Sequence, residues 1–193
     1  MAVTTQYTVE TLLESLKSHC PATYEHSIRV GKLLEAFTAY LGMEYNHMFE
    51  LGSLHDCGKL LIPSKLLNKE AKLTKSEYEE IKKHTRYGYE IILDTTDFPH
   101  TYANTILFHH ENIDKSGYYA LAGKDIPLLG KIIRIIDSYD TMLNGRIYQK
   151  SQAFEKVINE LIQLKEKMYD AHLVDNFISF IKNHYPMERQ NQI

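Results

Sequence analysis

Histidines and aspartates are the residues of this sequence whose types and spacing could carry out chemistry. They fall at five separate places, each inside a stretch with helical spacing of apolar residues. Imidazole nitrogens with carboxylate oxygens, and no paired cysteine thiolates, are typical of hydrolytic Fe, Mn, Ni or Zn sites rather than of structural zinc. Ions held by such a set would activate water and bind phosphoryl oxygens. The candidate ligands are His26, His55, Asp56, His84, His109, His110 and Asp137.

The position of His26 shows how an element could present one of these side chains. Val30, Leu33 and Phe37 follow it at helical spacing, so His26 lies on the inward, apolar stripe of its helix. A single inward histidine is usually a hydrogen-bonded core residue. The other histidines and aspartates of the chain favour the ligand interpretation instead.

Lys59 follows His55 by about one helical turn. A cation bound at His55 and Asp56, together with this ammonium group, would suit a phosphate. The alternative is a lysine that only stabilises the C-terminal end of its helix. The segment by itself leaves the two interpretations equal.

The elements that position these residues are predicted to be helices throughout, because period-two alternation is hard to find anywhere in the chain. The fold class is therefore all-α. The five prolines fall between or at the starts of the periodic stretches, where proline does least harm. The predicted helices cover residues 8–19, 23–41, 46–59, 74–94, 99–110, 126–145, 151–168 and 170–184. The longest non-periodic stretch is DKSGYYALAGKDIP, which suits an exposed loop.

Composition narrows the classes of protein further. A chain of 193 residues suits one domain, predicted to span 1–193. The formal charge of −3 gives no basic field for a polynucleotide, so any phosphate ligand must be bound locally. Cys20 and Cys57 could form at most one disulfide, and no segment approaches the ~20 apolar residues of a membrane span. We expect a cytoplasmic protein that binds neither membrane nor polynucleotide.

Five segments carry a family resemblance over roughly residues 20 to 150: HSIRV, HDCGKLLIP, the lone His84 with Gly88, HHENIDKSGYY, and IPLLGKIIRIIDSYDTMLNGRIY. In this order and at these spacings they resemble the HD superfamily of phosphohydrolases and, within it, the HD-GYP family of cyclic di-GMP phosphodiesterases. The resemblance implies a helical bundle with a metal site in its core, followed by two C-terminal helices over residues 151–185. It also implies hydrolysis of a cyclic dinucleotide by a metal-bridging hydroxide.

The resemblance assigns roles to individual residues. The seven candidate ligands would hold two divalent ions, with Asp56 between them. Fe or Mn is preferred, with Ni, Zn or Mg as alternatives. Asp56 and Lys59 would be catalytic. The implied substrate contacts are Lys59, Tyr118, Asp140, Arg146 and Lys150.

The sequence departs from the family pattern in the loop and at one helix start. The Gly-Tyr-Pro triplet reads Gly117-Tyr118-Tyr119, and Lys115 stands where glycine is common. Losing the proline restores a backbone N–H at Tyr119. Ala22 stands where some members carry a glutamate that helps to hold a third metal. Alanine cannot ligate, so the sequence predicts two ions rather than three.

Two alternatives stay open at this point. The same metal chemistry could act on another nucleotide or phosphate ester, or the fold could sense a nucleotide without turnover. A small nucleotide is the expected ligand in each case, and a homodimer or a signalling-protein partner is compatible with all three. Cys57 is interpreted as core packing. The histidines set aside as structural are His19, His47, His100, His172 and His184.

Overall fold

A computed structural model describes residues 7–145 and 151–185 of the chain. Within these residues the elements are α-helices joined by loops and short 3₁₀ turns, and no strand occurs, so the all-α prediction is confirmed. The elements are α1 (Val9–His19), α2 (Pro21–Tyr40), α3 (Met48–Leu54), η1 (Cys57–Leu61), α4 (Ser64–Leu67), α5 (Lys75–Lys82), α6 (His84–Leu93), η2 (His100–Tyr102), α7 (Ala103–Phe108), η3 (Gly123–Asp125), α8 (Leu128–Asn144), α9 (Phe154–Gln163) and α10 (Ala171–Asn183).

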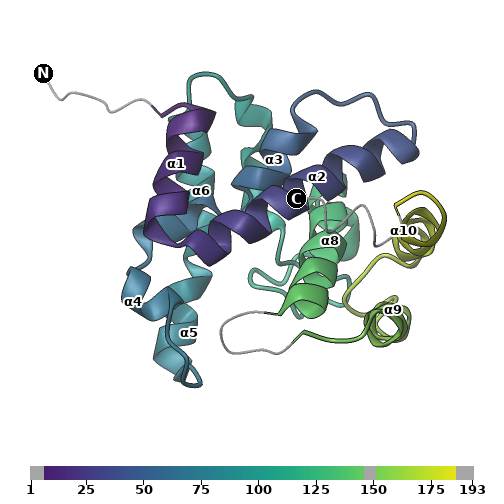
Figure 1. The fold of residues 1–193 in the computed structure, drawn as a ribbon. Coiled ribbons are helices and arrows are strands. Elements are labelled where there is room, and N and C mark those ends of the chain that lie inside the picture. The colour runs from purple at the N-terminus through teal and green to yellow at the C-terminus, as the bar shows by residue number, and fades with distance from the viewer. Residues whose placement is uncertain (1–6, 146–150, 186–193) are drawn as a thin grey trace, which may run out of the picture.

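The long helix α2 crosses the front of the bundle, with α1 and α6 on one side and α9 and α10 on the other (Figure 1). It packs closely on α3 because glycines face each other there. A Cβ atom on Gly52 would lie 2.7 Å from the Cα of Gly31, so neither position accepts a side chain without displacement of backbone. Because of this contact, the N-terminal half of α2 lies next to the residues that follow α3.

Local signals in the sequence begin several of these helices. Thr8 and Thr74 form capping boxes at the starts of α1 and α5, and the Asp170 side chain caps α10. Pro21 occupies the first turn of α2, where its missing N–H is harmless. Pro127 directly precedes α8. The predicted placement of prolines at helix starts is therefore confirmed at these two positions.

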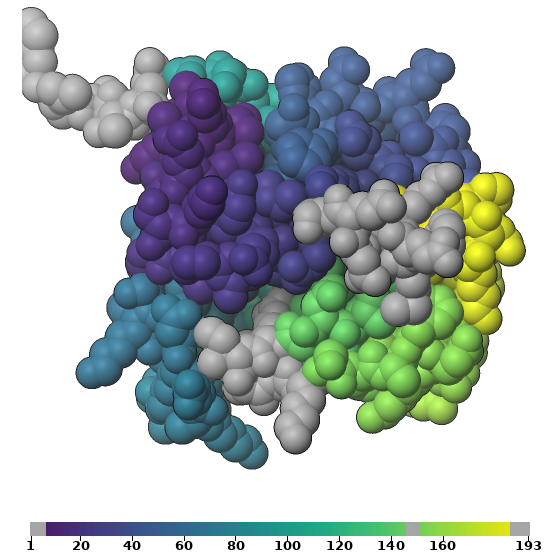
Figure 2. Space-filling view, in the orientation of Figure 1, coloured from purple at the N-terminus to yellow at the C-terminus, as the bar shows by residue number. Residues whose placement is uncertain are grey.

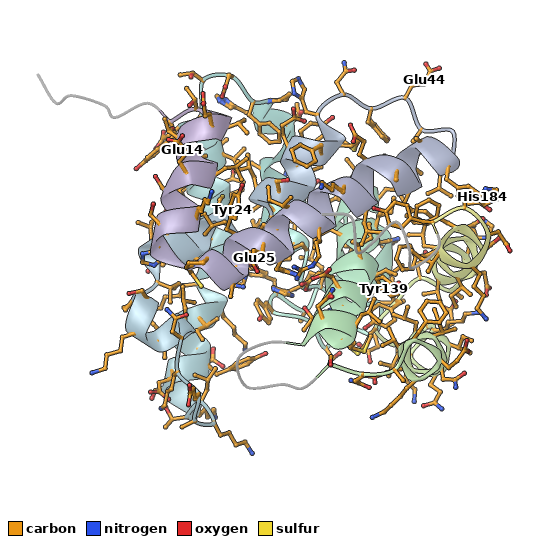
Figure 3. The ribbon with its side chains drawn as sticks, in the orientation of Figure 1. Glu14, Tyr24, Glu25, Glu44, Tyr139 and His184 are labelled. Atoms are coloured by element: carbon orange, nitrogen blue, oxygen red, sulfur yellow. The ribbon has the colours of Figure 1, made fainter. Side chains whose placement is uncertain are left out.

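The core is built around α8. Ile132, Ile133 and Ile136 are fully buried, so this helix meets apolar neighbours on several sides. On its far side Tyr139 packs against Phe177 of α10, with ring centroids 5.2 Å apart (Figure 3). The burial of such side chains stabilises each by about 1.5–3 kcal/mol relative to exposure. The C-terminal helices thus close one face of the helix that carries Asp137.

The α4–α5 segment projects from the rest of the surface (teal in Figure 2). Neither helix buries any residue completely. None of the helices in the described ranges has the length and hydropathy that a bilayer span requires.

Several predicted boundaries are wrong. The helix predicted over 46–59 ends at Leu54, and a 3₁₀ turn follows from Cys57. The helix predicted over 74–94 breaks at Lys83 into α5 and α6. The one predicted over 99–110 begins with a 3₁₀ turn, and the one over 151–168 shrinks to Phe154–Gln163. Apolar periodicity continues through these breaks, so it cannot report them.

Candidate metal centre

His55, His84 and His109 are oriented in the same way, each near a helix end. The Nδ1 atom of each ring lies 2.6–2.7 Å from the carbonyl oxygen three residues earlier, namely that of Gly52, Ile81 and Ile106. A carbonyl only accepts hydrogen bonds, so Nδ1 carries the proton in all three rings. Each Nε2 therefore presents a lone pair to the interior, as a metal-binding histidine must.

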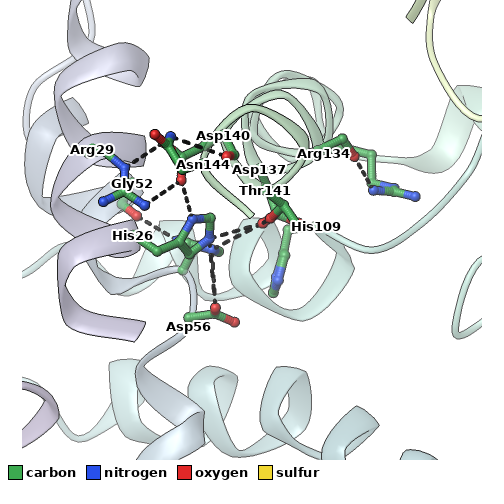
Figure 4. Close-up of polar contacts among 12 residues, drawn as sticks. His26, Arg29, Gly52, Asp56, His109, Arg134, Asp137, Asp140, Thr141 and Asn144 are labelled. Carbon is green, nitrogen blue, oxygen red and sulfur yellow. Dashed lines mark hydrogen bonds and ion pairs between the residues drawn. The ribbon is translucent and has the colours of Figure 1, made fainter. Parts of the chain in front are cut away.

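His26 reaches the same interior from α2 through a different support (Figure 4). Its Nδ1 donates to Oδ2 of Asp140 at 2.7 Å, while the same carboxylate accepts from Arg29 Nε at 2.7 Å and Nη2 at 2.9 Å. The Asn144 side chain donates to Asp140 Oδ1 at 2.9 Å. A carboxylate behind a histidine fixes the tautomer and increases the basicity of the other nitrogen. His26 Nε2 is thereby directed at Asp137 Oδ1, 3.0 Å away.

Asp56 lies at the middle of the cluster. Its Oδ1 is 3.2 Å from Nε2 of His84, and its Oδ2 is 3.5 Å from Nε2 of His55 and 4.0 Å from Nε2 of His26. Lys59 Nζ donates to Oδ2 at 2.5 Å. The two oxygens of one carboxylate therefore face two different sets of histidines.

Asp137 and His110 complete the set from α8 and from the end of α7. Oδ1 of Asp137 is 4.0 Å from Nε2 of His55, and its Oδ2 is 3.9 Å from Nδ1 of His110. Tyr118 covers His110, with ring centroids 4.7 Å apart and planes at 38°. The structure thus brings all seven predicted ligands into one centre.

Six of the seven candidate ligands, all but Asp137, divide into two groups that share one residue. Asp56, His84, His109 and His110 form one group, and His26, His55 and Asp56 form the other, with the atoms of each group within 4.8 Å of one another. The fully buried Nε2 of His55 makes no hydrogen bond within the described residues. A buried nitrogen of this kind is costly unless a ligand occupies its lone pair. The set therefore fits bound metal, and Asp56 is available to both groups.

The protonation states of the histidines and of Asp56 are those that metal binding requires. Burial lowers the pKa of His55 to about 4 and that of His109 to about 3, so both rings are neutral at pH 7. Burial would raise the pKa of Asp56, but the nearby Lys59 and the histidines outweigh it and hold that pKa well below its usual value. Neutral imidazoles and ionised carboxylates are the forms that bind metals.

The predicted substrate contacts have different positions. Tyr118 borders a cavity of about 650 Å³ that also reaches His110 and Asp137. Burial raises the pKa of Tyr118, so the phenol keeps its proton and can donate a hydrogen bond. Lys59 is buried and paired with Asp56.

Asp140 is the predicted contact whose position argues for another role. Protein donors occupy both of its carboxylate oxygens, which favours positioning of His26 over contact with a substrate. Arg146 and Lys150 lie outside the described residues.

Glu111 holds the loop that carries Tyr118, a role that the sequence interpretation missed although Glu111 stands in the quoted segment HHENIDKSGYY. It is 2% exposed, and its carboxylate accepts from the backbone N–H groups of Tyr119 and Leu121, both at 2.7 Å. The first of these bonds uses the N–H that a proline at position 119 would lack. Lys115 takes the left-handed conformation, with φ of 68°, that glycine would adopt with less strain. The variant loop is therefore anchored by contacts that its own residues provide.

None of the set-aside histidines belongs to the two ligand groups within the described residues. Nε2 of His19 bonds to the carbonyl oxygen of Ile62 at 2.8 Å, and Nε2 of His100 bonds to that of Thr95 at 3.0 Å. Cys57 is fully buried, and burial together with Asp56 raises its pKa to about 12. The thiol therefore stays protonated and acts in packing.

Substitution of Asp140 by asparagine is expected to weaken metal binding by about 10- to 100-fold while the helical content stays unchanged. The neutral amide loses the charge-assisted bonds from His26 and Arg29, so the His26 ring is no longer fixed. Titration of metal-free protein with Mn²⁺ measures the change. The matched control is Asp175→Asn on α10, whose exposed carboxylate pairs with Lys165. Equal Mn²⁺ affinities in the two variants would contradict the positioning role of Asp140.

Comparisons with known proteins show the family to which this chain belongs. The family model described as HD domain matches residues 10–173. The chain is 34% identical over 166 residues to a cyclic di-GMP phosphodiesterase of Thermotoga maritima, covering 83% of this chain and 45% of that protein. It is 31% identical over 177 residues to 3'3'-cGAMP-specific phosphodiesterase 2 of Vibrio cholerae, covering 89% of this chain and 34% of that protein. The chain thus spans less than half the length of these relatives.

A solved structure shares the fold. The HD domain of the phosphodiesterase PgpH of L. monocytogenes, in complex with cyclic-di-AMP, superposes with a TM-score of 0.61 at 22% identity, covering 88% of this chain and 81% of that one. At this identity the likeness shows that the helical arrangement is that of HD domains.

Proposed function

The chain belongs to the HD-domain family, and we propose that it is a metal-dependent phosphodiesterase that hydrolyses a cyclic dinucleotide, with cyclic di-GMP as the leading substrate. The observation that carries the proposal is Asp56, whose two oxygens face two groups of histidines in the core of the bundle. The cavity beside Asp137 and His110 gives a small nucleotide access to that centre.

Two divalent ions bound by these residues would lower the pKa of water and neutralise the phosphoryl oxygens. The chain's own residues do the remaining work. Asp140 and the backbone carbonyls hold the histidines so that their lone pairs converge. Lys59 holds Asp56 ionised and adds a positive charge beside the position that a phosphate would take.

Tyr118 is proposed to position the nucleotide, since its protonated hydroxyl and its ring border the cavity. Arg146 and Lys150 are proposed as phosphate contacts on the family resemblance alone. Ala22 leaves the N-terminal turn of α2 without a carboxylate, which supports two ions, with Fe or Mn preferred. The proposal extends to a cytoplasmic location, in keeping with two free, buried cysteines, and to a homodimer or a signalling-protein partner.

The rival substrates share the metal chemistry. The Vibrio cholerae relative is named for 3'3'-cGAMP and the PgpH structure contains cyclic-di-AMP, so another cyclic dinucleotide is the second candidate. A sensing module without turnover is disfavoured, because six buried ligands that converge would be costly to keep without ions.

The proposal predicts that protein purified anaerobically and loaded with Mn²⁺ or Fe²⁺ hydrolyses cyclic dinucleotides, with the highest kcat/KM for cyclic di-GMP. A panel of cyclic di-GMP, 3'3'-cGAMP, cyclic di-AMP and nucleoside monophosphates, followed by chromatography of the products, measures it. Metal-free protein is the control and should be inactive. A preference for monophosphates would replace the proposed reaction with phosphomonoester hydrolysis, and binding without products would indicate a sensor.

A further inference from the structure

Arg134 stands in the wall of the cavity next to the metal centre and has no role in the function proposed above. It belongs to α8, one turn before the candidate ligand Asp137. Arg134, Asp137, Ser138 and Thr141 all line the cavity, at the i, i+3, i+4 and i+7 spacing of a single helix face. Arg134 therefore precedes Asp137 by about one helical turn on the face of α8 that borders the cavity.

The guanidinium group of Arg134 is held in place by neutral partners. Its Nε donates to Oδ1 of Asn112 at 3.0 Å, and its Nη1 donates to Oγ of Ser138 at 2.6 Å. The group lies over the ring of Tyr169, with 5.5 Å from Cζ to the ring centroid. Asn112 in turn donates to Ser116 in the loop that carries Tyr118. The orientation of the arginine is thus fixed before any ligand binds.

No carboxylate neutralises Arg134 within the described part of the chain. Its hydrogen bonds use two of the five N–H donors of the guanidinium group. Lys82, which also lines the cavity, is paired with Glu79 at 3.0 Å. Glu160 lines the same cavity but makes no ion pair with Arg134. A half-buried, fixed and unneutralised guanidinium group suits an anion that carries two acceptor oxygens.

A cyclic dinucleotide supplies such an anion. It carries two phosphodiesters on opposite sides of one ring, and only the one undergoing cleavage can lie at the metal centre. The other carries a negative charge into the same cavity, where leaving it without a partner would be costly. We propose that Arg134 binds the phosphate of the substrate that is not being cleaved. This inference rests on the proposed function, and it names the residue that would distinguish a cyclic dinucleotide from an ester with one phosphate.

The test compares two substrates in metal-loaded protein: cyclic di-GMP, and bis(4-nitrophenyl) phosphate, which has one phosphodiester. Arg134→Gln is expected to raise KM for cyclic di-GMP by about 10- to 100-fold and to leave kcat/KM for the simple diester within about twofold, because one charge-assisted contact is lost. Arg134→Lys keeps a charge without the two-donor geometry and should give an intermediate KM. Arg86→Gln is the matched control, because Arg86 is exposed and paired with Glu90. It should leave KM and kcat/KM unchanged for both substrates.

Three results would overturn the assignment. Equal losses of kcat/KM on both substrates, or a fall in metal content, would mean that Arg134 acts through the metal centre or through the loop that carries Tyr118. An unchanged KM in both Arg134 variants would remove it from the binding site. A rise in KM for cyclic di-GMP without a rise in KM for cyclic di-AMP would mean that Arg134 recognises the base.

Failure of the proposed function gives a different pattern. Wild-type protein would then hydrolyse bis(4-nitrophenyl) phosphate but no cyclic dinucleotide. That result would withdraw the premise together with the role of Arg134.

Discussion

Asp56→Asn is expected to lower the rate of hydrolysis by at least about a thousandfold, which corresponds to about 4 kcal/mol of transition-state stabilisation. Asp56 is the residue that both ligand groups share, so one substitution removes a charged ligand from both groups. The amide has the same size and can still accept from Lys59. Helicity should therefore stay close to that of the wild type while bound metal falls below half.

Elemental analysis after desalting, circular dichroism and a steady-state assay measure these three quantities. Asp125→Asn, an exposed aspartate in η3, is the matched control and should behave as wild type. Wild-type protein should retain two equivalents of Mn or Fe per chain. A rate in Asp56→Asn near that of the wild type would refute the assignment of the centre. A stable third equivalent in the wild type would refute the inference drawn from Ala22.

Gly58→Ala is expected to destabilise the protein by about 3 kcal/mol or more, or to prevent folding. A Cβ atom at this position would lie 1.9 Å from the carbonyl oxygen of His84 and 2.4 Å from the backbone nitrogen of Gly88. Both atoms are backbone of α6, so no side-chain rotation can relieve the overlap. For a chain of this size the loss corresponds to a fall in Tm of roughly 6–12 °C.

The matched control is Gly130→Ala, another buried glycine, in α8. Its Cβ would have no neighbour closer than 3.7 Å, so the stability should be unchanged or raised by up to about 1 kcal/mol. Thermal unfolding of metal-free protein measures both variants. Equal Tm values in the two variants would contradict the close packing of Gly58 against α6. In Gly58→Ala, metal content should also fall, because the contact holds Asp56 beside His84.

The sequence by itself determined the helical class and the chemical type of the centre. Both follow from local information: apolar periodicity marks inward faces, and several histidines and aspartates within helical stretches of one chain indicate a shared metal site. His26 illustrates this, since its stripe with Val30 and Phe37 directs it inward in the sequence and in the structure. The resemblance of five motifs added Asp56 as the shared residue, and the two ligand groups meet there.

Only the tertiary structure decided how each ligand is held. The bond from His26 to Asp140 joins residues 114 positions apart, so no local pattern carries it. The prediction that Asp140 contacts substrate came from the family resemblance. Periodicity also missed the breaks after Leu54 and at Lys83, because the apolar pattern continues through them. Next to each break a backbone carbonyl accepts a hydrogen bond from a histidine and orients its ring.

Arg134 gave no signal in the sequence for a related reason. A helix with arginine on one face resembles any solvated helix. Its fixed orientation and its place in the cavity wall depend on Asn112, Ser138 and Tyr169, which come together only when α8 packs against the loop and the chain after α9. The residue types thus determined which atoms could bind a metal or a phosphate. Packing between residues far apart in the sequence determined where the lone pairs and charges of those atoms point.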